Sequence, residues 1–221
     1  MTADPEIIAR YARLYSPLVS DCMDDIGVGT FSIPPGLQPF HRDPLRVVVG
    51  TAHTCQYEVT TVPEDLDVDL LLEVCDSATA GSVTITATTG DPSFAVWGGL
   101  MSTGTMARGG LGAVVDGPVR DLVQVFELGF PVWATSVTPR DVRKRGQVRS
   151  IDREVEFWGV RVRPGDLVMA DGNGVAIVPQ GHELAVLEAC EERLERERLT
   201  QESLQGSGRP LKAIYAQYKA I

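Results

Sequence analysis

The sequence predicts an α/β fold, in one domain that contains an internal antiparallel region and ends in a long C-terminal helix. Three patterns support this fold class. Apolar residues recur at helical spacing near the N-terminus, and valine-rich runs typical of strands alternate with further helical segments. Residues 181–205 are highly charged, with carboxylates and arginines three or four positions apart, as on the surface of a helix. No repeat, low-complexity tract or linker divides the sequence, so residues 1–221 are expected to form a single domain.

The first half of the chain predicts two helices followed by alternating strands and helices. Residues 5–15 carry apolar side chains at helical spacing, and a second helix begins at Ser16-Pro17 because proline fits the first turn. The valine- and threonine-rich residues 45–57 predict a strand that Gly50 interrupts. The next expected elements are a helix over 66–75, a strand over 82–88, a helix over 94–108 and a buried strand over 111–115.

The second half begins at Asp116-Gly117-Pro118, a turn that should lead into a helix from about 119 to 128. Residues 131–136 predict the next strand. Residues 143–163 consist of short, charged, alternating pieces, which indicate an antiparallel excursion rather than a strand–helix–strand unit. The remaining expected elements are strands over 167–170 and 175–178, the charged helix over 181–205 and a short helix after Pro210.

Composition argues against a nucleic-acid or membrane partner. The 43% apolar and 23% charged residues are ordinary for a globular domain, and the net charge of −10 lacks the basic face that nucleic-acid binding usually needs. No apolar run approaches the roughly 20 residues of a membrane span, and residues 1–10 lack the apolar core of a signal peptide. We therefore expect a soluble cytoplasmic protein whose cysteines are buried or idle thiols: Cys22, Cys55, Cys75 and Cys190.

The most informative stretch for chemistry is residues 98–131, where a glycine turn opens a helix and a later strand-to-helix crossing carries Arg120 and Asp121. Ligands of open α/β sheets bind where strands end and helices begin. Backbone N–H groups of the glycine turn could bind a carboxylate, Arg120 could grip the same anion, and Asp121 could ligate a hard divalent cation. The same pattern is equally consistent with Arg120 and Asp121 merely capping and pairing at a helix start.

Other kinds of site have weaker support. The three histidines share no ligand spacing, so a histidine-rich zinc site is not expected. If a metal binds, oxygen ligands favour Mg²⁺ or Mn²⁺ with waters completing the shell. The acidic residues Asp21, Asp24 and Asp25 are expected to cap or solvate a helix, with one of them facing the site as the alternative. The sequence contains no nucleotide-binding glycine loop and no serine-nucleophile elbow.

Several segments together resemble the RraA-like family, which includes the regulator of ribonuclease activity and 4-hydroxy-4-methyl-2-oxoglutarate aldolase. The matching features cover nearly the whole chain. They are Gly99 followed by Arg120-Asp121, the sequence ARGGLGAVVDGPVRD that leads to this pair, GFPVWA at 129–134, GDLVMADGNGVAIVP at 165–179, and Asp21 in VSDCMD. The resemblance implies a swivelling β/β/α domain of the RraA-like type, with a long C-terminal helix, assembled into homotrimers or homohexamers.

The resemblance also implies a site. The aspartate matching Asp121 would hold Mg²⁺ or Mn²⁺, largely through waters, and the arginine matching Arg120 would contact the substrate. Backbone groups of residues 99–101, namely Gly99, Leu100 and Met101, would seat the carboxylate of a small 2-oxo acid. A glutamate from the C-terminal helix of a neighbouring subunit, matching Glu197 with Glu195 as the second choice, would complete the metal site through water.

The expected function is a metal-dependent carbon–carbon lyase, either a class II pyruvate aldolase or an oxaloacetate decarboxylase, because both reactions pass through pyruvate enolate. Arg120 and Asp121 would carry the chemistry. The better-known aldolases, however, have acidic residues where this chain has Gly99 and Gln124. This difference motivates a second hypothesis, which ranks below the lyase: a non-catalytic regulator whose acidic surface binds a ribonuclease or helicase partner. A methyltransferase is disfavoured because no glycine-rich nucleotide loop follows the first strand.

Overall fold

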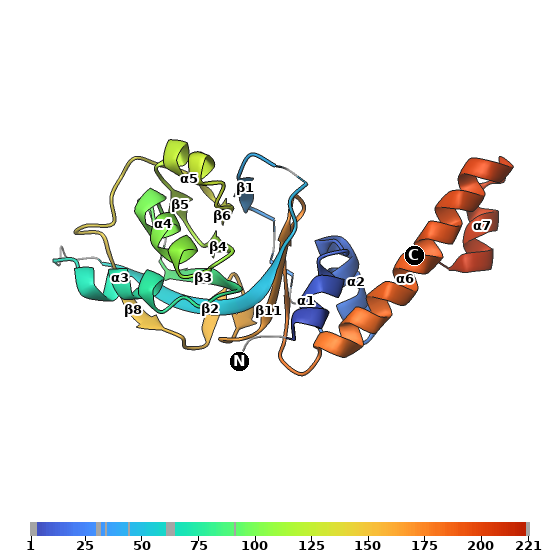
Figure 1. Ribbon diagram of the computed structural model, residues 1–221, viewed down its shortest axis with the longest axis horizontal. Coiled ribbons are helices and arrows are strands. Elements are labelled where there is room, and N and C mark those ends of the chain that lie inside the picture. The colour runs from blue at the N-terminus through green and yellow to red at the C-terminus, as the bar shows by residue number, and fades with distance from the viewer. Residues whose placement is uncertain are drawn as a thin grey trace.

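The fold is described from a computed structural model that covers residues 4–29, 32–33, 35–43, 45–60, 65–90 and 92–219. Its centre is a curved sheet with helices on its outer sides, and one long helix extends away from it (Figure 1). The strands lie in the order β1 (Gln38–Phe40), β6 (Val132–Ala134), β4 (Gly112–Val115), β3 (Ser82–Thr89), β2 (Val48–Val59), β11 (Leu167–Asp171) and β12 (Gly174–Val178).

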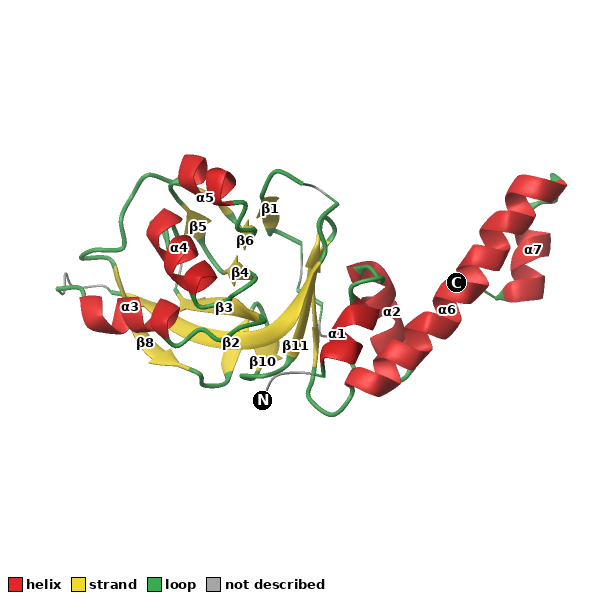
Figure 2. Ribbon diagram, in the orientation of Figure 1, coloured by secondary structure: helices red, strands yellow, loops and turns green. Residues whose placement is uncertain are grey.

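The middle of the sheet is parallel. β2, β3, β4 and β6 run in one direction, and most of their valine- and threonine-rich residues are buried, as expected for strands covered on both faces. Three helices pack against one face: α3 (Val68–Asp76), α4 (Gly99–Ala107) and α5 (Leu122–Leu128). The segments that follow β3 and β4 meet where Trp97 forms a parallel bridge with Val119. Figure 2 shows the three helices beside these strands.

The antiparallel part extends the sheet with one strand and covers its opposite face with a hairpin. β8 (Gly146–Ile151) pairs with β2, and the hairpin of β9 (Val155–Phe157) and β10 (Val160–Val162) packs across the sheet. Phe157 of this hairpin is fully buried and shares a cluster with Val83 and Ile85 of β3. The antiparallel excursion predicted over 143–163 is therefore confirmed.

A third layer consists of the N-terminal helices and the start of the C-terminal helix. α1 (Pro5–Tyr11) and α2 (Ser16–Asp25) pack with α6 (Glu183–Ser207) against β11 and β12. The buried contacts include Tyr11, Leu18, Met23 and Leu187. The rest of α6 extends away from the sheet, and α7 (Leu211–Tyr218) folds back along it (Figure 1).

Gly50 does not interrupt its strand, contrary to the sequence prediction. β2 continues through this position, and a Cβ there would lie 2.4 Å from the carbonyl oxygen of Gly81. Glycine is needed because the neighbouring backbone approaches closely.

Two helices begin later than their apolar patterns predict. The helix expected over 94–108 begins at Gly99, and residues 94–97 are buried without being helical. The helix expected from about 119 begins at Leu122, because Val119 belongs to β5 (Pro118–Val119), which pairs with β7 (Ser136–Val137). Tertiary pairing overrides local helical spacing in both segments.

All four cysteines are buried and free, in agreement with the sequence expectation. None of the described helices is long and apolar enough to cross a membrane.

Candidate functional site

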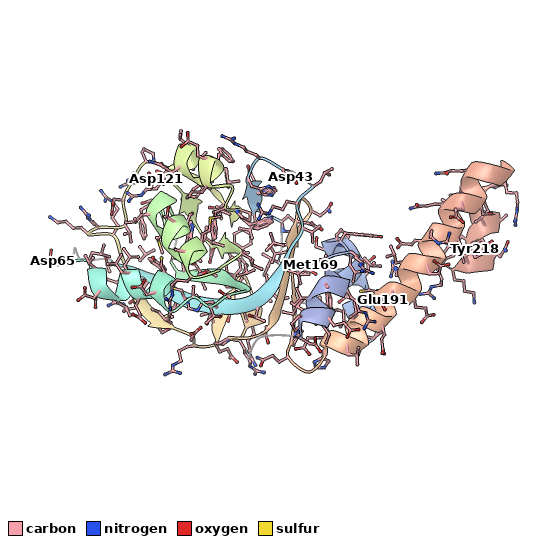
Figure 3. The ribbon with its side chains drawn as sticks, in the orientation of Figure 1. Asp43, Asp65, Asp121, Met169, Glu191 and Tyr218 are labelled. Carbon is pink, nitrogen blue, oxygen red and sulfur yellow. The ribbon has the colours of Figure 1, made fainter. Side chains whose placement is uncertain are left out.

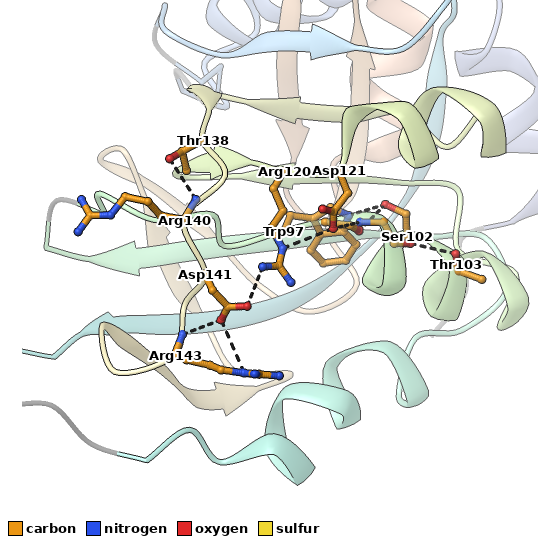
Figure 4. Close-up of polar contacts among 11 residues, drawn as sticks. Trp97, Ser102, Thr103, Arg120, Asp121, Thr138, Arg140, Asp141 and Arg143 are labelled. Carbon is orange, nitrogen blue, oxygen red and sulfur yellow. Dashed lines mark hydrogen bonds and ion pairs between the residues drawn. The ribbon is translucent and has the colours of Figure 1, made fainter.

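A cleft of about 410 Å³ opens between α3, α4 and the loop that carries Asp141. It brings together four residues that the sequence predicted for the site. These are Leu100, Met101, Arg120 and Asp121. Figure 4 shows that Arg120 lies between the carboxylates of Asp121 and Asp141.

Helix α4 begins at this cleft without a capping side chain, because its N-cap residue is Gly98. The Gly99 N–H donates a hydrogen bond to Asp121 Oδ2 at 3.1 Å. The amides of Leu100 and Met101 have no side-chain cap and stand at the positive end of the helix dipole. A Cβ on Gly98 would lie 2.7 Å from Asp121 Oδ2, so glycine permits the close approach of this carboxylate. The arrangement suits the binding of an anion.

Asp121 is held in a left-handed conformation, with φ 59° and ψ 40°, which aspartate tolerates better than most residues. It is the N-cap residue of α5, yet its side chain makes no capping hydrogen bond there. The carboxylate instead reaches across to α4, and its Oδ2 lies 3.4 Å from Arg120 Nε. Asp121 thus pairs with Arg120 and accepts a first-turn N–H of α4, but it does not cap its own helix α5.

Arg120 makes its shorter ion pair with Asp141, a residue that was not among those predicted for the site. Arg120 Nη1 donates to Asp141 Oδ2 at 2.7 Å, and Asp141 Oδ1 accepts the Arg143 N–H at 2.8 Å. Burial alone would raise the pKa of Asp141, but these hydrogen bonds and the charge of Arg120 lower it below the ordinary value. Its only sequence signal is a lone carboxylate in the arginine-rich segment 140–145, close behind a strand.

Glu197, which the resemblance assigns to the site of a neighbouring subunit, lies on α6, far from Asp121 of its own chain. Glu191, which lies on α6 as Glu197 does, is in a different part of the molecule from Asp121 (Figure 3). The Glu197 carboxylate accepts a hydrogen bond from the Tyr15 hydroxyl and lies 3.5 Å from Arg193 Nε. A single chain thus does not bring Glu197 to the cleft.

Glu195 also lies outside the cleft. It forms an ion pair with Arg198 of the same helix at 2.7 Å. The acidic residues of α2 do not face the cleft either. Asp21 and Asp25 bind the guanidinium of Arg193 at 2.8 and 2.9 Å, so they connect α2 to α6. Asp21 and Asp25 stay 55% and 67% exposed, so the expectation that they solvate a helix agrees with the structure, and the ion pairs with Arg193 of α6 are an addition to it.

The described residues contain no group of three histidine, cysteine, aspartate or glutamate side chains that could hold a metal. In the cleft, Asp141 is engaged by Arg120, whereas Asp121 is about a third exposed and its Oδ1 has no hydrogen bond to the described residues. One exposed carboxylate fits Mg²⁺ or Mn²⁺, which keep several waters, and does not fit a closed zinc shell. Gln124, whose Cβ lies against Gly99, is uncharged and is not among the residues that line the cleft.

Comparisons with known proteins agree with this architecture. A Halalkalibacterium halodurans protein, provisionally named a 4-hydroxy-4-methyl-2-oxoglutarate aldolase, is 28% identical over 191 residues, which are 86% of this chain and 85% of the relative. The solved structure of an uncharacterized Pseudomonas syringae protein has a TM-score of 0.86 at 25% identity, covering 99% of this chain and 96% of that one. Streptomyces coelicolor RraAS2, described as an unusual member of the RNase ES inhibitor RraA protein family, has a TM-score of 0.81 at 26% identity and covers 91% of this chain and 98% of its own.

Residues 16–177 match the family described as RraA-like, Aldolase/RraA. The matched span begins with α2, ends within β12 and includes every residue that lines the cleft. The resemblance expected from the sequence is confirmed, and the fold is that of the RraA structures. The chain belongs to the RraA-like family.

Proposed function

We propose that this protein is a divalent-metal-dependent carbon–carbon lyase that acts on a small 2-oxo acid, as a pyruvate aldolase or an oxaloacetate decarboxylase. The observation that carries the proposal is the meeting of the α4 N-terminus, Arg120 and Asp121 in one cleft. Helix N-termini and guanidinium groups both bind carboxylates, and a neighbouring aspartate suits a hard cation. The name of the Halalkalibacterium relative supports the same reaction class.

Each residue of the cleft would have a separate role in such a reaction. The amides of Leu100 and Met101 would hold the substrate carboxylate, and Arg120 would face the 2-oxo group. In aldol cleavage the C4 hydroxyl loses its proton as the C3–C4 bond breaks, and the electron pair stays on the pyruvate fragment as an enolate. In decarboxylation the same enolate forms as carbon dioxide leaves. Arg120 and the helix N-terminus stabilise its negative charge until a proton is added at C3.

Asp121 would hold the ion, with Mg²⁺ or Mn²⁺ as the expected cofactor. When bound, the ion supplies a Lewis acid that polarises the 2-oxo group. Asp121 Oδ2 is tied to the Gly99 N–H, which orients the carboxylate and leaves Oδ1 as its exchangeable oxygen.

Glu197 of a neighbouring copy would complete the site in a homotrimer or homohexamer. The support is that α6 extends beyond its own domain, where another copy could meet it (Figure 1). To reach another cleft, the Glu197 carboxylate would exchange its contacts with Tyr15 and Arg193 for waters around the ion.

A panel of 2-oxo acids tests the proposal. Oxaloacetate, 4-hydroxy-2-oxopentanoate and 4-hydroxy-4-methyl-2-oxoglutarate would each be incubated with the purified protein and Mg²⁺ or Mn²⁺, and pyruvate release followed with a coupled dehydrogenase. We expect release from at least one acid, stopped by a chelator and restored by excess metal. No metal-dependent turnover above background from any of them would refute the proposal.

The second candidate function is a non-catalytic regulator of a ribonuclease or helicase. It is supported by the likeness to RraAS2 and by the neutral residues Gly99 and Gln124, which contact each other at the start of α4. Affinity capture with the full chain as bait is the test. Recovery of an RNA-processing enzyme by both wild type and Asp121→Asn would favour the regulator, and recovery of none would count against it.

A further inference from the structure

The cleft continues beyond Arg120 and Asp121 as an apolar recess. Its wall is formed by side chains that are buried or partly buried in the core between the sheet and α3: Tyr57, Leu66, Leu71, Cys75, Val96 and Met101. The volume of about 410 Å³ lies in the range of roughly 300–1,000 Å³ that encloses ligands much larger than pyruvate. The carboxylate-binding end of the cleft therefore accounts for only part of its space.

The recess contains one buried polar group without a partner. Tyr57 is 0% exposed, lines the cleft, and its hydroxyl has no hydrogen bond to any described residue. Leaving a hydroxyl buried and unpaired costs free energy, so such groups usually have a partner in the functional state. Burial raises the pKa of Tyr57 well above its ordinary value, which keeps the hydroxyl neutral and able to donate.

The charged residues that line the cleft are not buried, and they include the exposed carboxylate Asp76 next to Cys75. The lining cations are Arg120, which pairs with Asp121 and Asp141, and Arg143, whose side chain is 75% exposed. Among the described lining residues, the buried wall has no cationic side chain. A second carboxylate placed against this wall would be buried without a partner, whereas an alkyl or aryl group would exchange water for apolar contacts.

Resting on the proposed lyase function, we propose that the recess binds an apolar substituent of the 2-oxo acid, and that Tyr57 hydrogen-bonds to a hydroxyl or carbonyl group on that substituent. Among 2-oxo acids, those with an alkyl or aryl chain should then bind more tightly than short dicarboxylic acids such as oxaloacetate. Tyr57 is a specificity-determining residue in this arrangement, while the α4 amides hold the common carboxylate and Arg120 faces the 2-oxo group.

Calorimetric binding of substrate analogues tests the recess without requiring turnover. The probes are 2-oxobutanoate, 2-oxohexanoate, 2-oxooctanoate and the dicarboxylate 2-oxoglutarate, each titrated into the full chain with Mg²⁺. We expect affinity to rise about fourfold for each methylene that enters the recess. 2-Oxoglutarate should bind more weakly than 2-oxohexanoate, and affinities that do not depend on chain length would overturn the subsite.

Tyr57→Phe tests the hydroxyl, because it removes one oxygen and keeps the buried ring. Wild type should bind 4-hydroxyphenylpyruvate about fivefold more tightly than phenylpyruvate, and Tyr57→Phe should bind the two equally. A variant that folds, as judged by its circular dichroism, and keeps the wild-type preference would overturn the role of Tyr57.

Two variants of similarly exposed apolar residues, one inside the cleft and one outside it, separate a local effect on binding from a general effect of the substitution. Leu72 is 44% exposed and lines the cleft, whereas Met106 is 47% exposed on α4 and does not. We expect Leu72→Gln to weaken 2-oxooctanoate binding severalfold and to leave 2-oxobutanoate unchanged. Met106→Gln should change neither affinity, and equal losses in both variants would contradict the subsite.

The outcomes distinguish failure of the subsite from failure of the lyase. Metal-dependent turnover of a 2-oxo acid without chain-length dependence would keep the lyase and overturn the recess. Chain-length-dependent binding without any turnover would keep the recess and remove the lyase. If none of the 2-oxo acids binds, both proposals are wrong.

Discussion

A Cβ added to Gly99 would lie 2.9 Å from the Cβ of Gln124, so the first residue of α4 lies directly against the Gln124 side chain of α5. These are the two positions at which the sequence lacks the acidic residues expected of better-known aldolases. The two missing acidic residues are therefore structurally linked, because a side chain at residue 99 has no room unless residue 124 moves. Asp121 is also close, with its Cβ 3.3 Å from the same point.

This contact predicts a coupling between the two positions. Gly99→Ala should lower the free energy of unfolding by about 1–3 kcal/mol, because it overpacks the α4–α5 contact. Gln124→Gly should cost about 1 kcal/mol through its helix propensity alone. The double variant should lose less free energy of unfolding than the two single variants lose together, since the Gln124 Cβ that blocks a side chain at residue 99 is gone. Urea unfolding of the four proteins measures this, and additivity within about 0.5 kcal/mol would contradict the contact.

The Arg120–Asp141 pair predicts a pH-dependent contribution to stability. The pKa of Asp141 is lowered from its ordinary value of 3.8, so folding favours the charged carboxylate. Wild type should therefore exceed Asp141→Asn in stability above pH 3.8, by up to about 1 kcal/mol because the pair is partly exposed. The difference should disappear as the pH falls through the lower, folded-state pKa. Unfolding curves of both proteins between neutral pH and about pH 2.5 test this, and a constant difference would be inconsistent with the pair.

Arg193 should be the main polar connection between α6 and the N-terminal helices. Its side chain is 10% exposed and pairs with Asp21, Asp25 and Glu197. Arg193→Met keeps the apolar stem and should lower the free energy of unfolding by about 1–3 kcal/mol. Arg196→Met is the control, because Arg196 is 40% exposed with one ion pair at 3.8 Å, and it should change stability by less than about 0.5 kcal/mol. Similar losses in the two variants would show that Arg193 has no special role.

Much of the fold could be predicted because its elements have strong local patterns. The valine-rich parallel strands, the antiparallel region and the charged α6 all appear where the sequence places them. The errors occur where tertiary pairing decides the structure. Trp97 and Val119 lie in segments with helical apolar spacing, yet they bridge each other as extended chain. No pattern within either segment contains that information.

The site was predictable where its residues follow one another along the chain. Arg120 and Asp121 are adjacent, and Leu100 and Met101 follow the glycine turn that the sequence displays. Asp141 was missed because it reaches Arg120 only through a loop that returns to the cleft. The role of Glu197 stays a prediction, because it depends on contacts between copies of the chain rather than within one.

The most direct test of the proposed chemistry compares wild type with Asp121→Asn in the metal-dependent release of pyruvate from the best 2-oxo acid. Asparagine tolerates the left-handed backbone of this position and can still accept the Gly99 N–H, so the variant should fold and melt like wild type. Loss of the charged carboxylate should lower kcat/KM by on the order of 10²-fold and abolish the response to added Mg²⁺ or Mn²⁺. A folded Asp121→Asn protein with wild-type turnover and an unchanged metal response would contradict the role of Asp121 at the centre of this site.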